Sequence, residues 1–305
     1  MLPIYNLEYD EQLTYMKLDV FSHCTIDTLY IDDSEYAVPG GPGCYCSLTA
    51  KTLKFDVALH TKFGRDYPLI DDFSKKKIDL DDAISEKPTT QFILKILDSD
   101  RTLFLQIICE PISYADLNSD GVIISPVFDE ISKDVFDKIQ KNSNFILLDP
   151  QGFLRQKNSE NKIYLKQTDL NLSNISAIKT NPDELNCLTG NHETDGMKIL
   201  QKKGIENVIL TDQQNISLLI KDKIYSVKLP NIRLFDTTGL GDIFCSVFCC
   251  TMLKEKDFLW AFSFAAGAVQ AALESKQIGL EKIPIKAAIE SNGSYFYHTV
   301  KFRDI

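Results

Sequence analysis

The most informative segment of this chain is Asp236-Thr237-Thr238-Gly239-Leu240-Gly241-Asp242-Ile243-Phe244, a glycine-containing turn that runs into an apolar stretch. Glycine lets the backbone approach a phosphate closely, and the first N–H groups of a helix have no partners within the helix. A helix that begins near Asp242 therefore predicts an anion site. The segment is not a dinucleotide fingerprint, because Phe244 stands where the third glycine is required, and it lacks the Gly-Lys-Ser/Thr of a P-loop.

Asp242 adds a carboxylate beside this predicted anion site. Such a carboxylate can accept the proton of an attacking hydroxyl, which is the usual contribution of the protein in kinase chemistry. An unperturbed aspartate has a pKa of about 3.9, so we expect Asp242 to be ionised at neutral pH. The alternative is that Gly241-Asp242 serves only as a turn and helix cap, and the spacing alone leaves both interpretations open.

Short β-branched runs alternate with helical patterns along the chain. This alternation predicts an α/β fold with a mainly parallel sheet covered on both faces and ligands at the carboxyl ends of the strands. The predicted strands are Lys17–Phe21, Val57–Thr61, Val122–Ser125, Phe145–Leu148, Ala177–Thr180 and Val208–Leu210. The predicted helices are Cys44–Leu53, Glu130–Gln140, Pro182–Leu188, Asp242–Leu253 and Asp257–Leu273.

Two segments interrupt the alternation and read as hairpins, because turn-forming residues separate paired apolar runs. They are Thr28–Ile31 with Tyr36–Val38, and Phe92–Leu97 with Leu103–Ile108. The second hairpin carries apolar residues on both pleat faces, with Phe92, Leu94 and Ile96 on one and Ile93 and Leu97, together with Lys95, on the other. Two apolar faces predict contact with the body of the protein and with a further partner, so we interpret the four strands as a small lid sheet.

Composition narrows the class of protein. The 305 residues are 44% hydrophobic and carry a net charge of −10, which disfavours binding to nucleic acid or to anionic membranes. No apolar run approaches the ~18–20 residues of a membrane span, and Met1–Asp10 has no basic stretch typical of a secretory signal. The eight cysteines form no Cys-x-x-Cys pair and the four histidines are scattered. We therefore expect a cytoplasmic protein with buried, reduced thiols and no catalytic zinc.

The segment 236–242 resembles the signature of the ribokinase family, the phosphofructokinase-B type carbohydrate kinases, in which Asp-Thr-Thr-Gly-Ala-Gly-Asp opens the catalytic helix. Only Leu240, in place of Ala, departs from that signature. The resemblance implies a ribokinase-like three-layer αβα fold with a mainly parallel central sheet and a small β-sheet lid. It implies one kinase domain over residues 1–305, with lid segments at about 28–39 and 89–110. It also implies that Asp242 is the base and that the backbone amides of Gly239, Leu240 and Gly241 stabilise charge on the transferring phosphoryl group.

Further residues match the substrate side of the family. Gly40-Gly41-Pro42-Gly43, before the helix predicted from Cys44, resembles the Gly-Gly motif that packs against the sugar. Asp27 matches the aspartate that binds substrate hydroxyls. Taken without the resemblance, the glycines could form a plain tight turn and Asp27 could be a surface acid. Tyr45 stands where the family usually has an asparagine facing the sugar, so ribose is not specified as the acceptor.

The nucleotide side of the resemblance begins at Asn181-Pro182-Asp183-Glu184, which resembles the family's Asn-x-x-Glu motif for hydrated Mg²⁺ and phosphate. The same four residues also predict an N-cap and a capping box, and both roles are compatible. Glu184 is thus the implied metal residue. The other implied nucleotide contacts are Asn181, Thr211, Thr238, Gly267 and Gly279, although small residues such as Gly267 also serve close helix packing.

Together these features imply an ATP-dependent kinase of a small sugar or polyol, with Mg²⁺ as cofactor and room for a monovalent cation such as K⁺. A nucleoside kinase is the nearest alternative. A ribokinase-like binding protein that has lost catalysis is another, although it would have no reason to keep Asp242 with both flanking glycines. Family members form dimers through the lid, so a homodimer that covers the second hairpin is expected.

Overall fold

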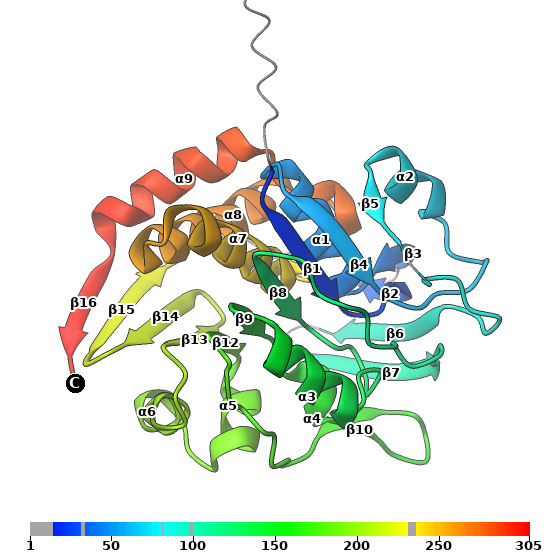
Figure 1. Cartoon of the computed structure of the whole chain (residues 1–305), viewed down its shortest axis with the longest axis horizontal. Helices are drawn as coiled ribbons and strands as arrows, with labels where there is room; N and C mark the ends of the chain where they lie inside the picture. Colours follow the sequence, from blue (N-terminus) through cyan, green and yellow to red (C-terminus); the bar gives the residue numbers. More distant parts are fainter. Residues whose placement is uncertain (1–14, 32–33, 81, 98–99, 231–235) are drawn as a thin grey trace, which may run out of the picture.

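The computed structural model describes residues 15–31, 34–80, 82–97, 100–230 and 236–305. Within these residues a ten-stranded central sheet runs through the molecule (Figure 1). Its strands, in spatial order, are β16 (Lys301–Asp304), β15 (Lys223–Lys228), β14 (Asn215–Ile220), β13 (Asn207–Asp212), β12 (Ala177–Thr180), β9 (Ile146–Leu148), β8 (Gly121–Ile124), β1 (Lys17–Phe21), β4 (Asp56–His60) and β5 (Ile78–Asp79).

The strands from β13 to β5 are mutually parallel, which confirms the expected mainly parallel sheet. The six strands predicted from β-branched runs all lie in this parallel part, within one to two residues of their observed ends. The remaining strands, β14, β15 and β16, add an antiparallel extension at the other edge. The sequence analysis did not identify this extension.

Helices cover both faces of the sheet, which confirms the three-layer arrangement (Figure 1). One apolar core joins the sheet to α1 (Pro42–Thr52), α7 (Leu240–Glu255), α8 (Phe258–Ser275) and α9 (Lys286–Thr299). A second core lies on the other face, against α3 (Lys133–Asn142), α5 (Pro182–Thr189) and α6 (Glu193–Lys202). Parallel strands buried in this way present their carboxyl ends, and the loops that follow them, to one edge of the sheet.

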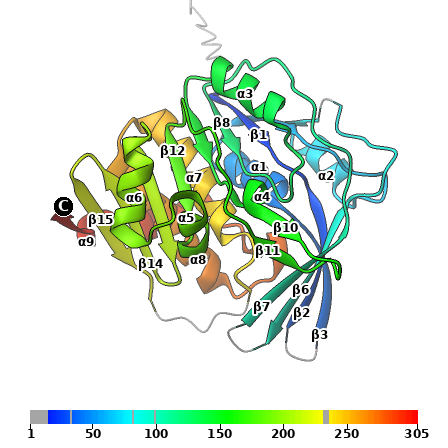
Figure 2. The same cartoon turned by 90° about the horizontal axis from the view of Figure 1, so that it is seen from below.

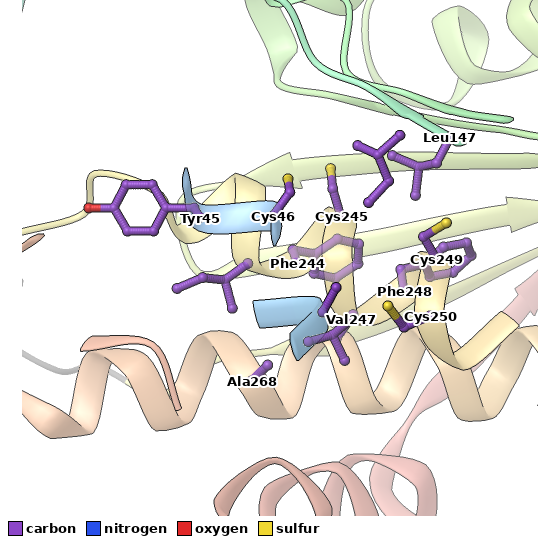
Figure 3. Close-up of a cluster of buried hydrophobic side chains, with 14 of the residues drawn as sticks. Tyr45, Cys46, Leu147, Phe244, Cys245, Val247, Phe248, Cys249, Cys250 and Ala268 are labelled. Carbon is purple, nitrogen blue, oxygen red and sulfur yellow. The ribbon is translucent and has the colours of Figure 1, made fainter. Parts of the chain in front are cut away.

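The helix α7 is the most deeply buried of these elements. Figure 3 shows Cys245 beside Leu147 of β9 on the sheet side of α7, and Val247 and Cys250 turned toward α8 and its Ala268. Since α7 lies between the sheet and α8, it is apolar on nearly every side and contains three fully buried cysteines. Seven of the eight cysteines are buried and Cys187 is half-buried, as expected from their apolar neighbours.

A four-stranded lid sheet projects from one side of the body (Figure 2). Its order is β3 (Ser34–Gly40), β2 (Thr25–Ile31), β6 (Thr90–Leu97) and β7 (Asp100–Ile107), so the two predicted hairpins pair through a parallel β2–β6 contact. Phe92 and Leu94 are buried on the face turned toward the body. Ile93 on the opposite face is half-buried. The side chains of Ile96 and Leu97 lie outside the described residues.

Shorter elements complete the fold. They are α2 (Ile70–Lys75), α4 (Gln151–Leu154), the antiparallel pair β10 (Arg155–Lys157) and β11 (Ile163–Leu165), and the 3₁₀ helix η1 (Gly279–Lys282). The β10–β11 pair and η1 matter for the site, because both lie close to the lid. In the part of the chain that the structure describes, no helix combines the length and the hydropathy needed to cross a membrane.

Candidate functional site

A cleft of about 500 Å³ opens between the lid and the carboxyl ends of the parallel strands. Its apolar side comes from the lid, with Leu29, Phe92, Leu94 and Leu103, and its polar side comes from the body and from the lid strand β2. The charged residues that line the polar side are Asp27, Asp149, Arg155, Lys179, Asp183, Glu184 and Asp242. These residues come from six separate segments of the chain, and the fold therefore assembles the site.

The N-terminus of α7 forms one end of this cleft. Gly239 is its N-cap and has φ +78°, a left-handed conformation that favours glycine. A Cβ at Gly239 would also overlap the ring of Tyr45, and a Cβ at Gly241 would lie 3.0 Å from the ammonium nitrogen of Lys179. Within the described residues, the N–H groups of Gly239, Gly241 and Asp242 have no hydrogen-bond partner. The turn thus presents unpaired donors to the cleft, beside a buried cation.

Asp242 lies in the first turn of α7 and is buried at the bottom of the cleft. The pKa of its carboxyl is raised to about 7, chiefly by burial and also by the nearby Asp149, while Lys179 and Arg155 offset part of the rise. The sequence analysis expected the ordinary pKa and full ionisation at neutral pH, and this expectation was wrong because it took no account of burial. Asp242 is therefore poised to exchange a proton near neutral pH.

Asp27 occupies the other polar end of the cleft, on the lid strand β2. Burial raises the pKa of Asp27 to about 7, and its Oδ1 is a buried oxygen without a hydrogen-bond partner in the described structure. A Cβ at Gly40 would lie 2.5 Å from Asp27 Oδ2, and a Cβ at Gly41 would lie 2.7 Å from the carbonyl oxygen of His23. The paired glycines therefore make room for the Asp27 side chain and for the start of α1.

Two basic side chains, Lys179 and Arg155, also line the cleft. Lys179 Nζ donates to Asp149 Oδ2 at 2.8 Å, and both side chains are buried. Burial lowers the pKa of Lys179, but the carboxylates of Asp149 and Glu184 outweigh burial and raise it overall. Arg155 donates to the Val127 carbonyl and to Gln151, which holds its guanidinium at the cleft.

Glu184 and Asn181 form the capping box that the sequence predicts. Asn181 N–H donates to Glu184 Oε2 at 2.8 Å, and Glu184 N–H donates to Asn181 Oδ1 at 2.9 Å. Both residues line the cleft. No cluster of three or more His, Cys, Asp or Glu side chains suited to a metal occurs among the described residues. A Mg²⁺ ion here would keep most of its water shell, which suits one carboxylate plus donor phosphates.

Residues 34–284 match the model of the pfkB family of carbohydrate kinases. The chain belongs to this family. No curated protein matches the sequence.

Solved structures of ribokinase-like kinases share the fold of this pfkB-family chain. A pyrophosphate-dependent kinase of the ribokinase family, solved with a pyrophosphate analogue and myo-inositol, is 19% identical, with 90% of this chain and 99% of that one covered and a TM-score of 0.76. Arabidopsis thaliana ribokinase, in complex with ribose and ATP, is 18% identical. The match covers 92% of this chain and 99% of the ribokinase, with a TM-score of 0.73. A nucleoside kinase from Methanocaldococcus jannaschii is 15% identical, with 90% of this chain and 98% of the nucleoside kinase covered and a TM-score of 0.69.

Most of the site residues expected from the family resemblance meet at the cleft. Those that line it are Asp27, Gly41, Asn181, Glu184, Thr238, Gly239, Gly241 and Asp242. Gly40 lies beneath Asp27, and Leu240 is half-buried in the first turn of α7. The other three expected contacts do not line this cleft. Thr211 lies at the end of β13 and donates to the Thr180 carbonyl, and Gly279 opens η1.

Gly267 has a packing role in this pfkB-family fold. A Cβ at Gly267 would lie 2.3 Å from the backbone nitrogen of Gly293 on α9. The close α8–α9 contact therefore accounts for the glycine at this position. The sequence analysis had named close helix packing as an alternative role for this small residue. A nucleotide contact at Gly267 stays a prediction.

Four residues of the cleft were missed or given no role by the sequence analysis. Lys179 is a lysine inside an otherwise apolar predicted strand, which is a usable signal for a functional charge. Asp149 directly follows the strand β9, at the carboxyl edge of the sheet. Tyr45 was noted only as a departure from the family. The segment 149–155 follows a predicted strand and was expected near the cleft, but the sequence left open whether Arg155 meets a phosphate or substrate or is solvent-exposed; the structure brings it to the cleft.

A larger cavity, of about 880 Å³, lies along β1 and β4 away from this cleft. It contains the buried Asp19–His60 pair, with 2.8 Å between Asp19 Oδ1 and His60 Nε2. None of the residues expected from the family signature lines it. The smaller cleft is the better candidate, because it collects the strand ends, the helix N-terminus and the two carboxyls with raised pKa.

Proposed function

We propose that this chain is an ATP-dependent phosphotransferase that phosphorylates a hydroxyl of a small sugar or polyol. The observation that carries the proposal is the juxtaposition, in one cleft, of the buried Asp242 carboxyl and the unpaired amides at the start of α7. A base for an attacking hydroxyl and donors for a charged phosphoryl group are the two protein contributions that phosphoryl transfer requires.

Asp242 acts as the base in this proposal. Its pKa of about 7 keeps a large fraction ionised at neutral pH and makes the carboxylate a better proton acceptor than an ordinary aspartate. A hydroxyl held against Asp242 gives its proton to the carboxylate as its oxygen bonds to the γ-phosphorus of ATP, while the bond from that phosphorus to the bridging oxygen breaks and ADP leaves. The carboxylate also aligns that oxygen with the phosphate, which supplies part of the rate enhancement by orientation.

The unpaired amides of Gly239 and Gly241 act as the anion hole. The Leu240 N–H, which the resemblance also assigned to it, donates to the Thr237 carbonyl oxygen at 3.4 Å and is thereby engaged within the turn. Gly241 has a buried cation at its side, since a Cβ there would lie 3.0 Å from Lys179 Nζ. Backbone donors and a fixed ammonium group stabilise negative charge in a site from which water is largely excluded, and they need no reorganisation as the charge develops.

The acceptor binds beside Asp27 of the lid strand β2, against the apolar face of the lid. The unpaired Oδ1 of Asp27 provides an acceptor for a substrate hydroxyl, and the apolar lid residues Phe92 and Leu94 offer a surface for the C–H face of a ring. Closure of the lid segments, 28–39 and 89–110 of a single kinase domain, would exclude water that otherwise hydrolyses the donor.

Glu184 and Asn181 hold the donor side of the site. Bound Mg²⁺ would neutralise charge on the donor phosphates. From its place in the capping box, Glu184 would hold the ion through its hydration shell. Asn181, Thr211, Thr238, Gly267 and Gly279 are the proposed nucleotide contacts. ATP is the proposed donor, and the solved relatives include both an ATP-bound ribokinase and a pyrophosphate-dependent kinase.

A substrate screen tests the proposal. The purified chain is incubated with Mg²⁺ and either ATP or pyrophosphate, over pentoses, hexoses, ketodeoxy acids, inositols and nucleosides. Release of ADP or phosphate is measured, and the phosphorylated product is identified by ³¹P NMR. We expect acceptor-dependent transfer from ATP to a sugar or polyol, abolished in Asp242→Asn. Turnover with nucleosides alone would identify a nucleoside kinase in place of a sugar or polyol kinase. No turnover with any acceptor would favour a binding protein without catalysis.

A further inference from the structure

The ammonium group of Lys282 contacts the anion-hole turn, and Lys282 is not among the residues that line the cleft. Lys282 ends η1, and its side chain is 1% exposed. Its Nζ donates to Asp236 Oδ2, to the Asp236 carbonyl oxygen at 3.1 Å and to the Thr238 carbonyl oxygen at 2.9 Å. These oxygens all belong to the turn that leads to Gly239. Lys282 thus binds three oxygens of one turn from 44 or more residues away in the chain.

This arrangement is a cation site with a tethered occupant. A lysine ammonium group is a compact point charge with three N–H donors, and three oxygens of this one turn lie around it. Asp236 is fully bound as well: its Oδ1 accepts from Thr238 N–H at 2.8 Å and its Oδ2 accepts from Gly279 N–H at 3.0 Å. Burial raises the pKa of Asp236, but the Lys282 ammonium and these donors outweigh burial and lower it.

The cation also orients the anion hole through the geometry of one peptide unit. A trans peptide is planar, and its C=O and N–H bonds point in opposite directions. Every peptide bond in the described residues is trans. Lys282 holds the Thr238 carbonyl at 2.9 Å, so the Gly239 N–H of the same peptide unit must point away from Lys282. Gly239 lines the cleft and its N–H has no partner within the described structure.

We propose that the Lys282 ammonium group acts as a built-in monovalent cation that positions the Gly239 amide, so that this kinase needs no free K⁺. The family resemblance allowed a monovalent cation such as K⁺ as a cofactor. The structure disagrees at this turn, because its inward-facing carbonyl and carboxylate oxygens are already bound by Lys282. The cation site itself depends only on the contacts described, whereas its effect on catalysis rests on the proposed kinase activity.

The test compares Lys282→Ala, which leaves space for a free ion, with Lys282→Met, which fills that space with a neutral chain. Rates with the acceptor found in the screen are measured in NH₄⁺, K⁺, Na⁺ and choline chlorides at equal ionic strength. The rate of the wild type should be the same in all four salts. In choline, kcat of Lys282→Ala should fall by about 10²-fold, the loss typical of one anion-hole donor, with a smaller change in acceptor KM. NH₄⁺ or K⁺ should restore at least a tenth of the wild-type rate to Lys282→Ala and none to Lys282→Met.

Melting temperatures provide a second readout that does not depend on kinase activity. Binding of K⁺ to the folded state alone should raise the melting temperature of Lys282→Ala over its value in choline by roughly 2–4 °C. Lys62→Ala is the matched control, because Lys62 is another buried lysine paired with an aspartate, Asp82, at 2.8 Å and outside the cleft. Lys62→Ala should show no difference between the cations.

Two results would overturn the proposal. One is a wild-type protein whose rate or melting temperature responds specifically to K⁺, which can be measured even if Lys282→Ala fails to fold. The other is a folded Lys282→Ala that no monovalent cation restores or stabilises. Absence of activity with every acceptor would contradict the proposed function. The melting-temperature comparison would still decide whether Lys282 fills a cation site.

Discussion

Replacing Asp242 by asparagine should weaken catalysis and strengthen the fold, and the structure sets the pH at which each effect occurs. The folded protein raises the pKa of this carboxyl from its ordinary 3.8 to about 7, chiefly by burial. Asparagine keeps the size of the side chain and carries no charge at any pH. The variant therefore avoids the free-energy cost of ionising a buried carboxyl in the folded protein.

The direction in which stability changes with pH follows from the number of protons bound in the folded and in the unfolded state. Between pH 3.8 and pH 7 the unfolded chain has released the Asp242 proton and the folded protein keeps it, so stability falls as the pH rises and levels off above pH 7. At 1.36 kcal/mol for each pH unit, the span from pH 5 to the folded pKa corresponds to about 3 kcal/mol. We expect the gain in unfolding free energy of Asp242→Asn over wild type to be larger at pH 8 than at pH 5 by about this amount.

Catalysis should respond in the opposite direction. Loss of the proton acceptor should lower kcat by roughly 10²–10⁴-fold. ATP affinity should stay the same or tighten, since a negative charge near the phosphates is gone. In the wild type, kcat/KM should rise with pH through about 7 as Asp242 ionises.

Urea unfolding of both proteins at pH 5 and pH 8, together with steady-state kinetics, measures these quantities. Asp183→Asn is the matched control, because Asp183 lines the same cleft but is exposed and its charge is solvated in both states. Its effect on stability should not differ between the two pH values. If the stability gain of Asp242→Asn is the same at pH 5 and pH 8, burial does not control this carboxyl. A near wild-type rate for the variant would reduce Asp242 to a helix cap.

Three further outcomes are expected. Glu184→Gln should raise the Mg²⁺ concentration needed for half-maximal rate and lower kcat, at a stability cost of ~0.5–1 kcal/mol; an unchanged Mg²⁺ titration would leave only the capping role. Tyr45→Phe removes a buried hydroxyl that has no partner in the described structure and lies near Asp27 and Asp242, so acceptor KM should rise with little change in kcat, and unaltered kinetics would contradict a substrate contact. The lid, with half-buried apolar residues such as Ile93 on its outer face, should form dimers in sedimentation at micromolar concentration, whereas a monomer with an intact lid would refute lid-to-lid assembly.

Local patterns predicted those parts of the fold whose interactions are local. The strands β1 and β12 have the predicted ends, and the capping box of Asn181 and Glu184 forms as its four-residue spacing requires. The start of α7 at the glycine turn was predicted for the same reason, since helix starts depend on a few consecutive residues. These interactions need no knowledge of the rest of the chain.

Other features depend on distant contacts that no local pattern records. The edge strand β16 pairs with β15 across more than seventy residues, and its short polar sequence has no strand periodicity. Gly40 is required by the Asp27 side chain on the neighbouring strand. Lys282 meets Asp236 from 46 residues away, and the raised pKa of Asp242 arises only when the cleft is assembled.

The buried thiols of the core make this protein a reporter of its own unfolding. Burial raises the pKa of Cys245, Cys249 and Cys250 in α7, so these thiols are protonated and shielded from alkylating reagents in the native state. Cys187 on α5 is half-buried and is the one thiol within partial reach of solvent. A native sample should therefore incorporate at most one label rapidly, and the slow appearance of further mass in a spectrometer would time the opening of the helix that holds the proposed base.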